Sequence, residues 1–153
     1  MIATARLRLR PLTVADAPKL FAMSQAAGMR RWIPDQVYRD EAHAAEVVAS
    51  LADFAAQAFD PRARPFVLGI EHDRELVGHV GLSPCRGSVE VGYAIEDAHQ
   101  GRGLASEAVR AMVEWAQLPE VLGIVAADNV ASARVLEKAG FARIGDGPYR
   151  RTT

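Results

Sequence analysis

The sequence predicts an α+β fold in which helices flank a single mixed, mostly antiparallel sheet. Two observations support this prediction. Three consecutive runs with strand character occupy the middle of the chain, and runs with helical spacing of apolar residues lie before and after them. The length of 153 residues suits one domain, and we expect that domain to span residues 1–153 because no linker or repeat divides the chain.

The start of the chain predicts a strand followed by a short helix. Residues 6–12 (RLRLRPL) alternate between arginine and leucine over most of their length, which is the period of a half-buried strand. Thr13 or Asp16 can cap a helix that extends to about Gln25.

An irregular stretch and a long helix are expected next. Residues 28–38 contain Trp32 and Pro34 and are expected to be irregular. Asp40 is placed to cap an alanine-rich helix over about 41–58, in which the apolar residues recur near helical spacing.

The rest of the chain predicts three strands, a helix and a final strand-helix-strand unit. Residues 65–72 and 75–83 are expected to form a hairpin, and residues 88–95 a third strand. A glycine-rich turn then leads into a helix over about 103–117. The last elements are a buried strand at 122–127, a helix at 129–139 that ends at Gly140, and a short strand at 141–145. The predicted order is β-α-α-β-β-β-α-β-α-β.

The glycine-rich segment 100–105 (QGRGLA) is a candidate ligand site. Glycines let a ligand approach the backbone closely, and the free N–H groups at the start of the next helix point at the same place. The helix dipole makes that place favourable for a phosphate or pyrophosphate. A P-loop is excluded because no lysine lies near the turn. A dinucleotide-binding fold is disfavoured because positions 121–125 lack the acidic residue that it requires.

Three motifs, in this order, resemble those of one family. They are the strand Glu90-Val91-Gly92-Tyr93-Ala94-Ile95, the turn Gln100-x-x-Gly103-x-Ala105, and the helix Asn129-x-x-Ser132-x-x-x-Leu136-x-Lys138-x-Gly140-Phe141. On these motifs the chain resembles the GNAT superfamily of N-acetyltransferases, and within it the branch that acetylates the N-termini of ribosomal proteins. The resemblance covers nearly the whole chain. It implies the GNAT fold, acetyl-CoA as co-substrate, and transfer of the acetyl group to a primary amine by direct attack on the thioester.

The resemblance also implies roles for individual residues. Glu90 is expected to act as the base, directly or through water, and His79 on the neighbouring predicted strand is the alternative. Ser132 is expected to protonate the leaving thiolate or to bind the co-substrate, and the N–H of Ile95 to polarise the thioester carbonyl. The residues expected to bind acetyl-CoA are Tyr93, Ala94, Ile95, Gln100, Gly101, Arg102, Gly103, Leu104, Ala105, Asn129 and Ser132.

The chain departs from the family pattern in two places. Leu136 stands where many members have a tyrosine that acts as the general acid. The tail after Phe141 is also short, where the branch has a longer final hairpin. A non-catalytic acyl-CoA-binding or regulatory module on the same fold is therefore the alternative function.

Composition and charge argue against several other classes. The formal net charge of −1 disfavours a broad nucleic-acid-binding surface. His43, His72 and His99 lie far apart and Cys85 is the single cysteine, so no metal site is predicted. No apolar run approaches a membrane span, and the protein is expected to be cytoplasmic. The sequence leaves open whether the acceptor is a protein N-terminal α-amine or a small-molecule amine, and whether the protein is a monomer or a homodimer.

Overall fold

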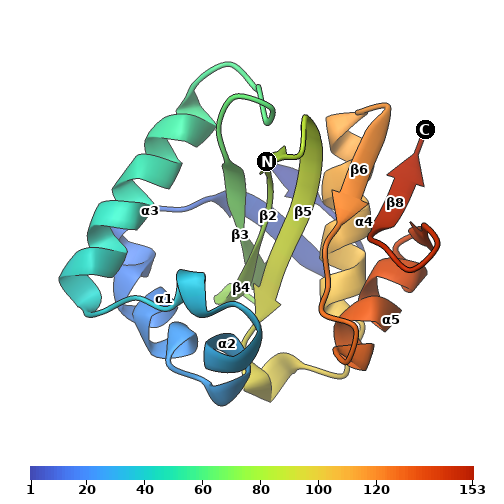
Figure 1. Cartoon of the computed structure of the whole chain (residues 1–153). Helices are drawn as coiled ribbons and strands as arrows, with labels where there is room; N and C mark the ends of the chain where they lie inside the picture. Colours follow the sequence, from blue (N-terminus) through green and yellow to red (C-terminus); the bar gives the residue numbers. More distant parts are fainter.

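The strand and helix patterns of the sequence assemble into an eight-stranded sheet with five helices packed against it (Figure 1). This computed structural model describes residues 1–153. The strands are β1 (Ile2–Ala3), β2 (Leu7–Pro11), β3 (Phe66–His72), β4 (Glu75–Cys85), β5 (Ser88–Ile95), β6 (Glu120–Gly123), β7 (Ala142–Arg143) and β8 (Tyr149–Thr152). The helices are α1 (Ala17–Ser24), α2 (Ala27–Trp32), α3 (Glu41–Ala56), α4 (Leu104–Ala116) and α5 (Val130–Lys138).

The sheet is open and mostly antiparallel, as predicted. Its strand order is β1-β2-β3-β4-β5-β6-β8-β7, and every neighbouring pair is antiparallel except β5 and β6. The predicted hairpin turn at Asp73-Arg74 joins β3 to β4, and both residues have positive φ angles, 49° and 66°. Asp40 caps α3 as expected, because its carboxylate accepts a hydrogen bond from the N–H of His43 at 2.7 Å.

The structure corrects the sequence predictions in two segments on either side of the site. Residues 28–38, expected to be irregular, contain most of α2 and a 3-10 helix over Pro34–Gln36. Helix α2 has no side-chain cap, so no capping signal marks its start in the sequence. The strand predicted at 122–127 is displaced, because β6 ends at Gly123 and Ile124 is 43% exposed. The apolar run continues beyond the point where the chain leaves the sheet.

The C-terminal strands also differ from the prediction. The strand expected at 141–145 is only Ala142–Arg143, and β8, which the sequence analysis missed, lies between β6 and β7. Strand β8 carries Arg150 and Arg151 and has no alternating apolar pattern, so its charged sequence resembles a loop. Strand β1 was missed as well, since it contains only two residues.

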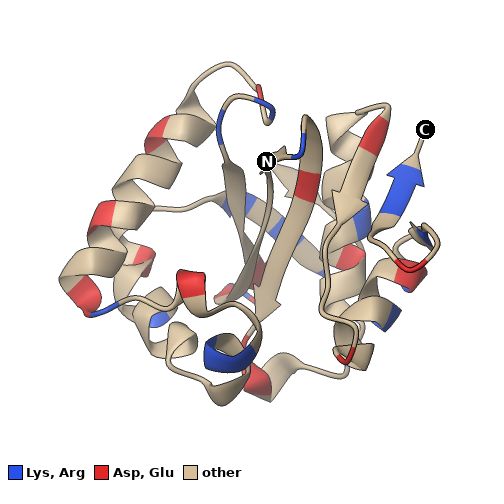
Figure 2. Ribbon diagram, viewed as in Figure 1, with Lys and Arg blue, Asp and Glu red and all other residues tan.

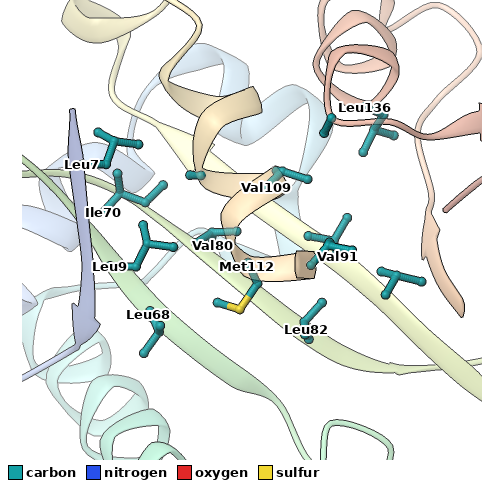
Figure 3. Close-up of a cluster of buried hydrophobic side chains, with 14 of the residues drawn as sticks. Leu7, Leu9, Leu68, Ile70, Val80, Leu82, Val91, Val109, Met112 and Leu136 are labelled. Carbon is teal, nitrogen blue, oxygen red and sulfur yellow. The ribbon is translucent and has the colours of Figure 1, made fainter. Parts of the chain in front are cut away.

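Two apolar clusters hold helices to opposite faces of the sheet. The larger cluster joins β2–β6 to α4 and α5, and Figure 3 shows side chains such as Leu9, Ile70 and Met112 meeting within it. The smaller cluster includes Leu20 of α1 and Val48 of α3. Because both faces are covered, each inward side chain gains the free energy of removal from water, about 1.5–3 kcal/mol for a fully buried aliphatic or Met side chain.

The parallel pair β5 and β6 is the feature that positions the site. The two strands are paired at one position only, where Glu90 lies opposite Leu122. Beyond that position they separate, and the gap widens toward the end of β5 (Figure 1). The chain enters α4 shortly after β5 and enters α5 shortly after β6, so two helix N-termini lie beside the gap.

Candidate active site where two strands separate

A cavity of about 470 Å³ lies at the end of β5. The walls come from α1, α2, the end of β5, the glycine-rich turn with the start of α4, and the start of α5. The structure brings together nearly all the residues predicted to bind acetyl-CoA, and only Arg102 is absent from the lining. The predicted residues that line the cavity are Tyr93, Ala94, Ile95, Gln100, Gly101, Gly103, Leu104, Ala105, Asn129 and Ser132.

The backbone of β5 directs polar groups into the gap. The N–H of Glu96 donates to the carbonyl of Val77 in β4 at 2.8 Å. Backbone groups of an antiparallel strand alternate in direction from one residue to the next. The N–H and C=O groups of Tyr93 and Ile95 therefore point away from β4, toward the side from which β6 has separated.

The glycine-rich turn has the backbone geometry of an anion site. Gly101 and Gly103 have φ angles of 79° and 77°, in the left-handed region, and Gly103 is the N-cap of α4. The first N–H groups of α4 have no partner within the helix and carry the positive end of its dipole. Arg6 holds the turn from outside, because its guanidinium donates to the carbonyl of Arg102 at 2.8 Å and pairs with Glu107 at 2.7 Å.

The side chains at the start of α5 are fixed by local hydrogen bonds. The Asn129 side chain accepts a hydrogen bond from the N–H of Ser132 at 3.2 Å and so caps the helix. The Tyr93 hydroxyl, which reaches this turn from β5, forms a hydrogen bond with the Ser132 hydroxyl and lies 3.1 Å from the Ser132 carbonyl oxygen. Burial raises the pKa of Tyr93, and the hydrogen bond with Ser132 offsets part of that rise.

Glu90 lies on the opposite face of β5 from Tyr93. Side chains of a strand alternate between faces, and Val89 and Val91 belong to the large cluster under α4. Tyr93 shares that face, whereas Glu90, Gly92 and Ala94 face the other way. Glu90 is half-buried and does not line the 470 Å³ cavity. The two residues predicted to be catalytic, Glu90 and Ser132, thus approach the gap from different faces of the sheet.

His79 is the second predicted base and lies on the same face as Glu90. It is paired with Ala94 across β4 and β5, and it lines the cavity. Burial lowers the pKa of His79 to about 4, so its imidazole is neutral at neutral pH. Cys85, near the start of β5, is close to Glu90, and burial together with the negative charge of Glu90 raises the pKa of its thiol.

One polar group at the site was missed by the sequence analysis. Glu96 lines the cavity and forms an ion pair with Lys19 Nζ at 2.9 Å. The buried Nδ1 of His99 lies 2.7 Å from Glu96 but has no hydrogen-bond partner. Lys19 also pairs with Glu75 at 2.9 Å. No sequence signal indicated this network, because Lys19 is far from Glu96 along the chain and no spacing rule connects them.

Leu136 does not face the cavity. Its side chain is 2% exposed and packs over Gly123, where an added Cβ would lie only 2.6 Å from a Leu136 methyl carbon. The position that many family members use for a tyrosine is therefore part of the core in this chain. The structure contains no group of three or more His, Cys, Asp and Glu side chains that could hold a metal ion. None of its helices is both long enough and apolar enough to cross a membrane.

Comparison with known proteins gives a consistent family assignment. A family model described as an acetyltransferase (GNAT) domain matches residues 6–142. The chain is similar to the uncharacterized N-acetyltransferase YnaD of Bacillus subtilis, with 25% identity over 150 residues that cover 94% of this chain and 84% of the relative.

Two solved structures share the fold at low sequence identity. The ribosomal L7/L12 α-N-protein acetyltransferase RimL, solved with coenzyme A, has a TM-score of 0.80 and 18% identity, and the alignment covers 97% of this chain and 95% of RimL. The enzyme AAC(6')-Ib, solved with ribostamycin and coenzyme A, has a TM-score of 0.75 and 20% identity, with 96% and 93% covered.

Proposed function

The chain belongs to the GNAT family of acetyltransferases, and we propose that Glu90 and Ser132 serve the transfer of an acetyl group from acetyl-CoA to the N-terminal α-amine of a polypeptide. Members of this family are acetyl-CoA-dependent N-acetyltransferases, so acetyl transfer to an amine is the activity of this chain. The proposal concerns the residues that carry out the reaction and the class of acceptor. The comparisons give no support to a non-catalytic binding module.

One observation carries the proposal: the predicted co-substrate residues, Arg102 excepted, share a single cavity at the point where β5 and β6 separate. The pyrophosphate of acetyl-CoA would lie at the glycine-rich turn, where the N–H groups of Gly103 and the first turn of α4 favour an anion. The pantetheine arm would extend along the gap beside the backbone groups of Tyr93 and Ile95. The N–H of Ile95 would donate to the thioester carbonyl oxygen as negative charge develops there.

The proton of the amine and the charge of the leaving thiolate would be handled on opposite faces of β5. The acceptor amine would approach from the face of Glu90, attack the thioester carbon and lose a proton to Glu90 or to a water molecule that Glu90 holds. The C–S bond then breaks, and its electron pair stays on sulfur. The Ser132 hydroxyl, on the other face, would stabilise this thiolate by a hydrogen bond. The thiol product takes up one proton, which balances the proton released by the amine.

The bases available at the site are weak, and an α-amine is the acceptor that needs the weaker base. At pH 7 an α-amine with a pKa near 8 costs about 1.4 kcal/mol to deprotonate, whereas a lysine side chain with a pKa near 10.4 costs roughly 4–5 kcal/mol. The imidazole of His79, with a pKa of about 4, is too weak a base to deprotonate a lysine side chain efficiently.

The charged residues at the cavity also favour a polypeptide as the acceptor over a polycationic amine. Glu96 and Asp97 are the acidic residues that line the cavity; Glu96 forms an ion pair with Lys19 at 2.9 Å, and Asp97 accepts a hydrogen bond from Gln100 at 3.3 Å. Helix α2, which lines the cavity through Gly28, Met29 and Trp32, carries the basic residues Arg30 and Arg31 (Figure 2). The apolar side chains Met23, Met29 and Trp32 line the wall formed by α1 and α2 and could accommodate the first side chains of a peptide.

The experiment is a thiol-release assay with four acceptors: a peptide with a free N-terminus, the same peptide blocked at its N-terminus but with a free lysine, a polyamine and an aminoglycoside. We expect the free N-terminal peptide to be the preferred acceptor. Replacing Glu90 with Gln should lower kcat/KM for that peptide by about 100-fold. The matched control is Glu46→Gln, an exposed glutamate of α3 without an ion pair, which should leave kcat/KM unchanged.

Three results would contradict parts of the proposal. Preference for the aminoglycoside or the polyamine would contradict the polypeptide acceptor. Wild-type activity of Glu90→Gln would contradict the role of Glu90 as base, and the same assay on His79→Asn would then test the second base. Tight binding of acetyl-CoA without turnover of any amine would contradict the catalytic proposal as a whole.

A further inference from the structure

Two hydroxyl groups from distant parts of the chain meet in the cavity wall. Tyr93 extends from β5 and Ser132 from the first turn of α5, and both residues line the cavity. Their hydroxyl groups are hydrogen-bonded to each other, and the Tyr93 hydroxyl also lies 3.1 Å from the Ser132 carbonyl oxygen. The side chain at position 136, one turn further along α5, is packed in the core and supplies no polar group.

The number of protons on the two hydroxyls limits their arrangement. Burial raises the pKa of Tyr93, so its hydroxyl is protonated and has one hydrogen to donate. The Ser132 carbonyl lies inside α5 and has two lone pairs, so beside a helix hydrogen bond it can also accept from the Tyr93 hydroxyl, which donates to it at 3.1 Å. The single Tyr93 hydrogen therefore has two acceptors within reach, the Ser132 carbonyl oxygen and the Ser132 hydroxyl oxygen, and either hydroxyl can be the donor in the hydroxyl pair. In the arrangement in which Ser132 accepts from Tyr93, the serine hydroxyl must direct its own hydrogen elsewhere, and Ser132 lines the cavity.

We propose that Tyr93 is a positioning residue that acts through Ser132: by donating to the Ser132 hydroxyl oxygen, it directs the Ser132 hydrogen toward the sulfur of coenzyme A. This inference rests on the proposed function, since it takes the sulfur to lie beside Ser132. Many family members have a tyrosine hydroxyl on the last helix at the position of Leu136. In this chain a tyrosine hydroxyl reaches the same helix from β5, as Tyr93. Tyr93 stabilises the thiolate only through the orientation of Ser132, and no proton leaves Tyr93.

The test uses Tyr93→Phe, which keeps the ring in its partly buried place and removes the hydroxyl. The first readout needs no acceptor: the pKa of the thiol of bound coenzyme A is measured from thiolate absorbance, and the spectrum of the protein alone is subtracted to remove Cys85. A hydrogen bond to the thiolate lowers the thiol pKa. We expect the thiol pKa to be about one unit higher in Tyr93→Phe than in the wild type, with the dissociation constant of coenzyme A within a factor of two.

The second readout is kinetic and includes a matched control. In Tyr93→Phe, kcat should fall about tenfold or more while the KM for acetyl-CoA changes by less than threefold. The kcat of Ser132→Ala should fall at least as far. The double variant should have the same kcat as Ser132→Ala, because Tyr93 acts only through Ser132. Tyr149→Phe is the control: Tyr149 bonds Glu137 at 3.4 Å outside this cavity, and its variant should keep the wild-type kcat.

Each outcome has a defined consequence. An unchanged thiol pKa in Tyr93→Phe, or additive losses of kcat in the double variant, would overturn this inference and leave the proposed function standing. Failure of the wild type to bind coenzyme A would overturn the proposed function and the inference together. Failure of all acceptors would overturn the catalytic proposal as a whole, whereas a thiol pKa difference that persists there would still support the action of Tyr93 through Ser132 on the sulfur of bound coenzyme A.

Discussion

Leu136 and Gly123 show how one pair of residues separates the core from the site. Leu136 lies over the end of β6, and the absence of a side chain at Gly123 makes room for it. A tyrosine at position 136 would have to displace β6 or turn its hydroxyl into the apolar cluster, and burial of an unpaired hydroxyl is unfavourable. Removal of this position from the chemistry is therefore a consequence of packing.

We predict that Gly123→Ala lowers the free energy of unfolding by about 1–3 kcal/mol, because its Cβ would lie 2.6 Å from a Leu136 methyl carbon in a filled core. The loss should be smaller when Leu136 is also changed to Ala. Urea unfolding of the two single variants and the double variant measures this coupling. Gly92→Ala is the control, because no atom lies within 4 Å of its added Cβ. Equal losses for Gly123→Ala with and without Leu136 would contradict the account.

His79 makes stability depend on pH. Its pKa is about 4 in the folded protein and near 6.5 when unfolded, so folding favours the neutral imidazole. The unfolded chain therefore binds a proton as the pH falls below 6.5, while the folded protein does not until about pH 4. The resulting contribution to stability is complete at neutral pH and is lost as the pH falls through that window.

We predict that His79→Gln reduces this loss of stability. Between pH 7 and pH 5 the free energy of unfolding of the wild type should fall by about 1–2 kcal/mol more than that of the variant. Urea unfolding at the two pH values gives the comparison, and carboxylates common to both proteins cancel in the difference. If the free energy of unfolding changed with pH equally in the wild type and His79→Gln, the lowered pKa of His79 would be contradicted.

Among the contacts between elements, a partly buried ion-pair network of Arg10, Asp16 and Glu71 ties β2 and β3 to the start of α1. The guanidinium of Arg10 pairs with both oxygens of Asp16, at 2.9 and 3.0 Å, and with Glu71 at 2.8 Å. Asp16 also accepts from the N–H of Thr13 at 2.9 Å. Burial raises the pKa of Asp16, but the hydrogen bonds from Arg10 and Thr13 outweigh it and bring the pKa below its ordinary value. Because α1 forms part of the cavity wall, this contact helps to fix that wall.

We predict that Asp16→Asn lowers the free energy of unfolding by about 2–3 kcal/mol at pH 7, since it leaves Arg10 without its main partner. A lowered carboxyl pKa adds stability above the unfolded pKa, and that stability is lost in acid. The difference between wild type and variant should therefore shrink from pH 7 to pH 3. Asp53→Asn, at an exposed position of α3, should change stability by less than about 0.5 kcal/mol. A difference that stays constant with pH would contradict the ion pair.

The elements that the sequence predicted well are those whose signal is local. Strands β2, β3, β4 and β5 follow alternating or apolar runs bounded by turn residues, and α3, α4 and α5 follow helical spacing with caps or glycines at their ends. The errors occur where long-range packing decides. The apolar run after Leu122 leaves the sheet because β6 pairs with β5 at a single position, and β8 is a strand because it pairs with β6.

At the scale of the whole molecule, the same distinction applies to the site. Each of the three sequence motifs contributes residues to the cavity, because each motif lies where an element meets the gap, although Glu90 and Leu136 of these motifs do not line it. The contact between Tyr93 and Ser132, 39 residues apart, and the Lys19–Glu96 pair depend on how distant elements pack. Spacing along the chain contains no information about either contact. The division of Glu90 and Ser132 between two faces of the sheet likewise became visible only in three dimensions.

We propose that acetyl-CoA binds in the gap with its pyrophosphate at the glycine-rich turn, and a calorimetric comparison of two glycine variants can check this placement. Gly101 and Gly87 have similar φ angles, 79° and 75°, and an added Cβ would meet no atom within 4 Å at either position. Changing either glycine to glutamate therefore adds the same charge and similar backbone strain, but only Gly101 lines the cavity.

Acetyl-CoA is titrated into the wild type, Gly101→Glu and Gly87→Glu. We expect Gly101→Glu to weaken binding at least tenfold, because the carboxylate would lie beside the pyrophosphate, and Gly87→Glu to bind like the wild type. Equal affinity of the two variants, or no binding by the wild type, would rule out this position of the pyrophosphate.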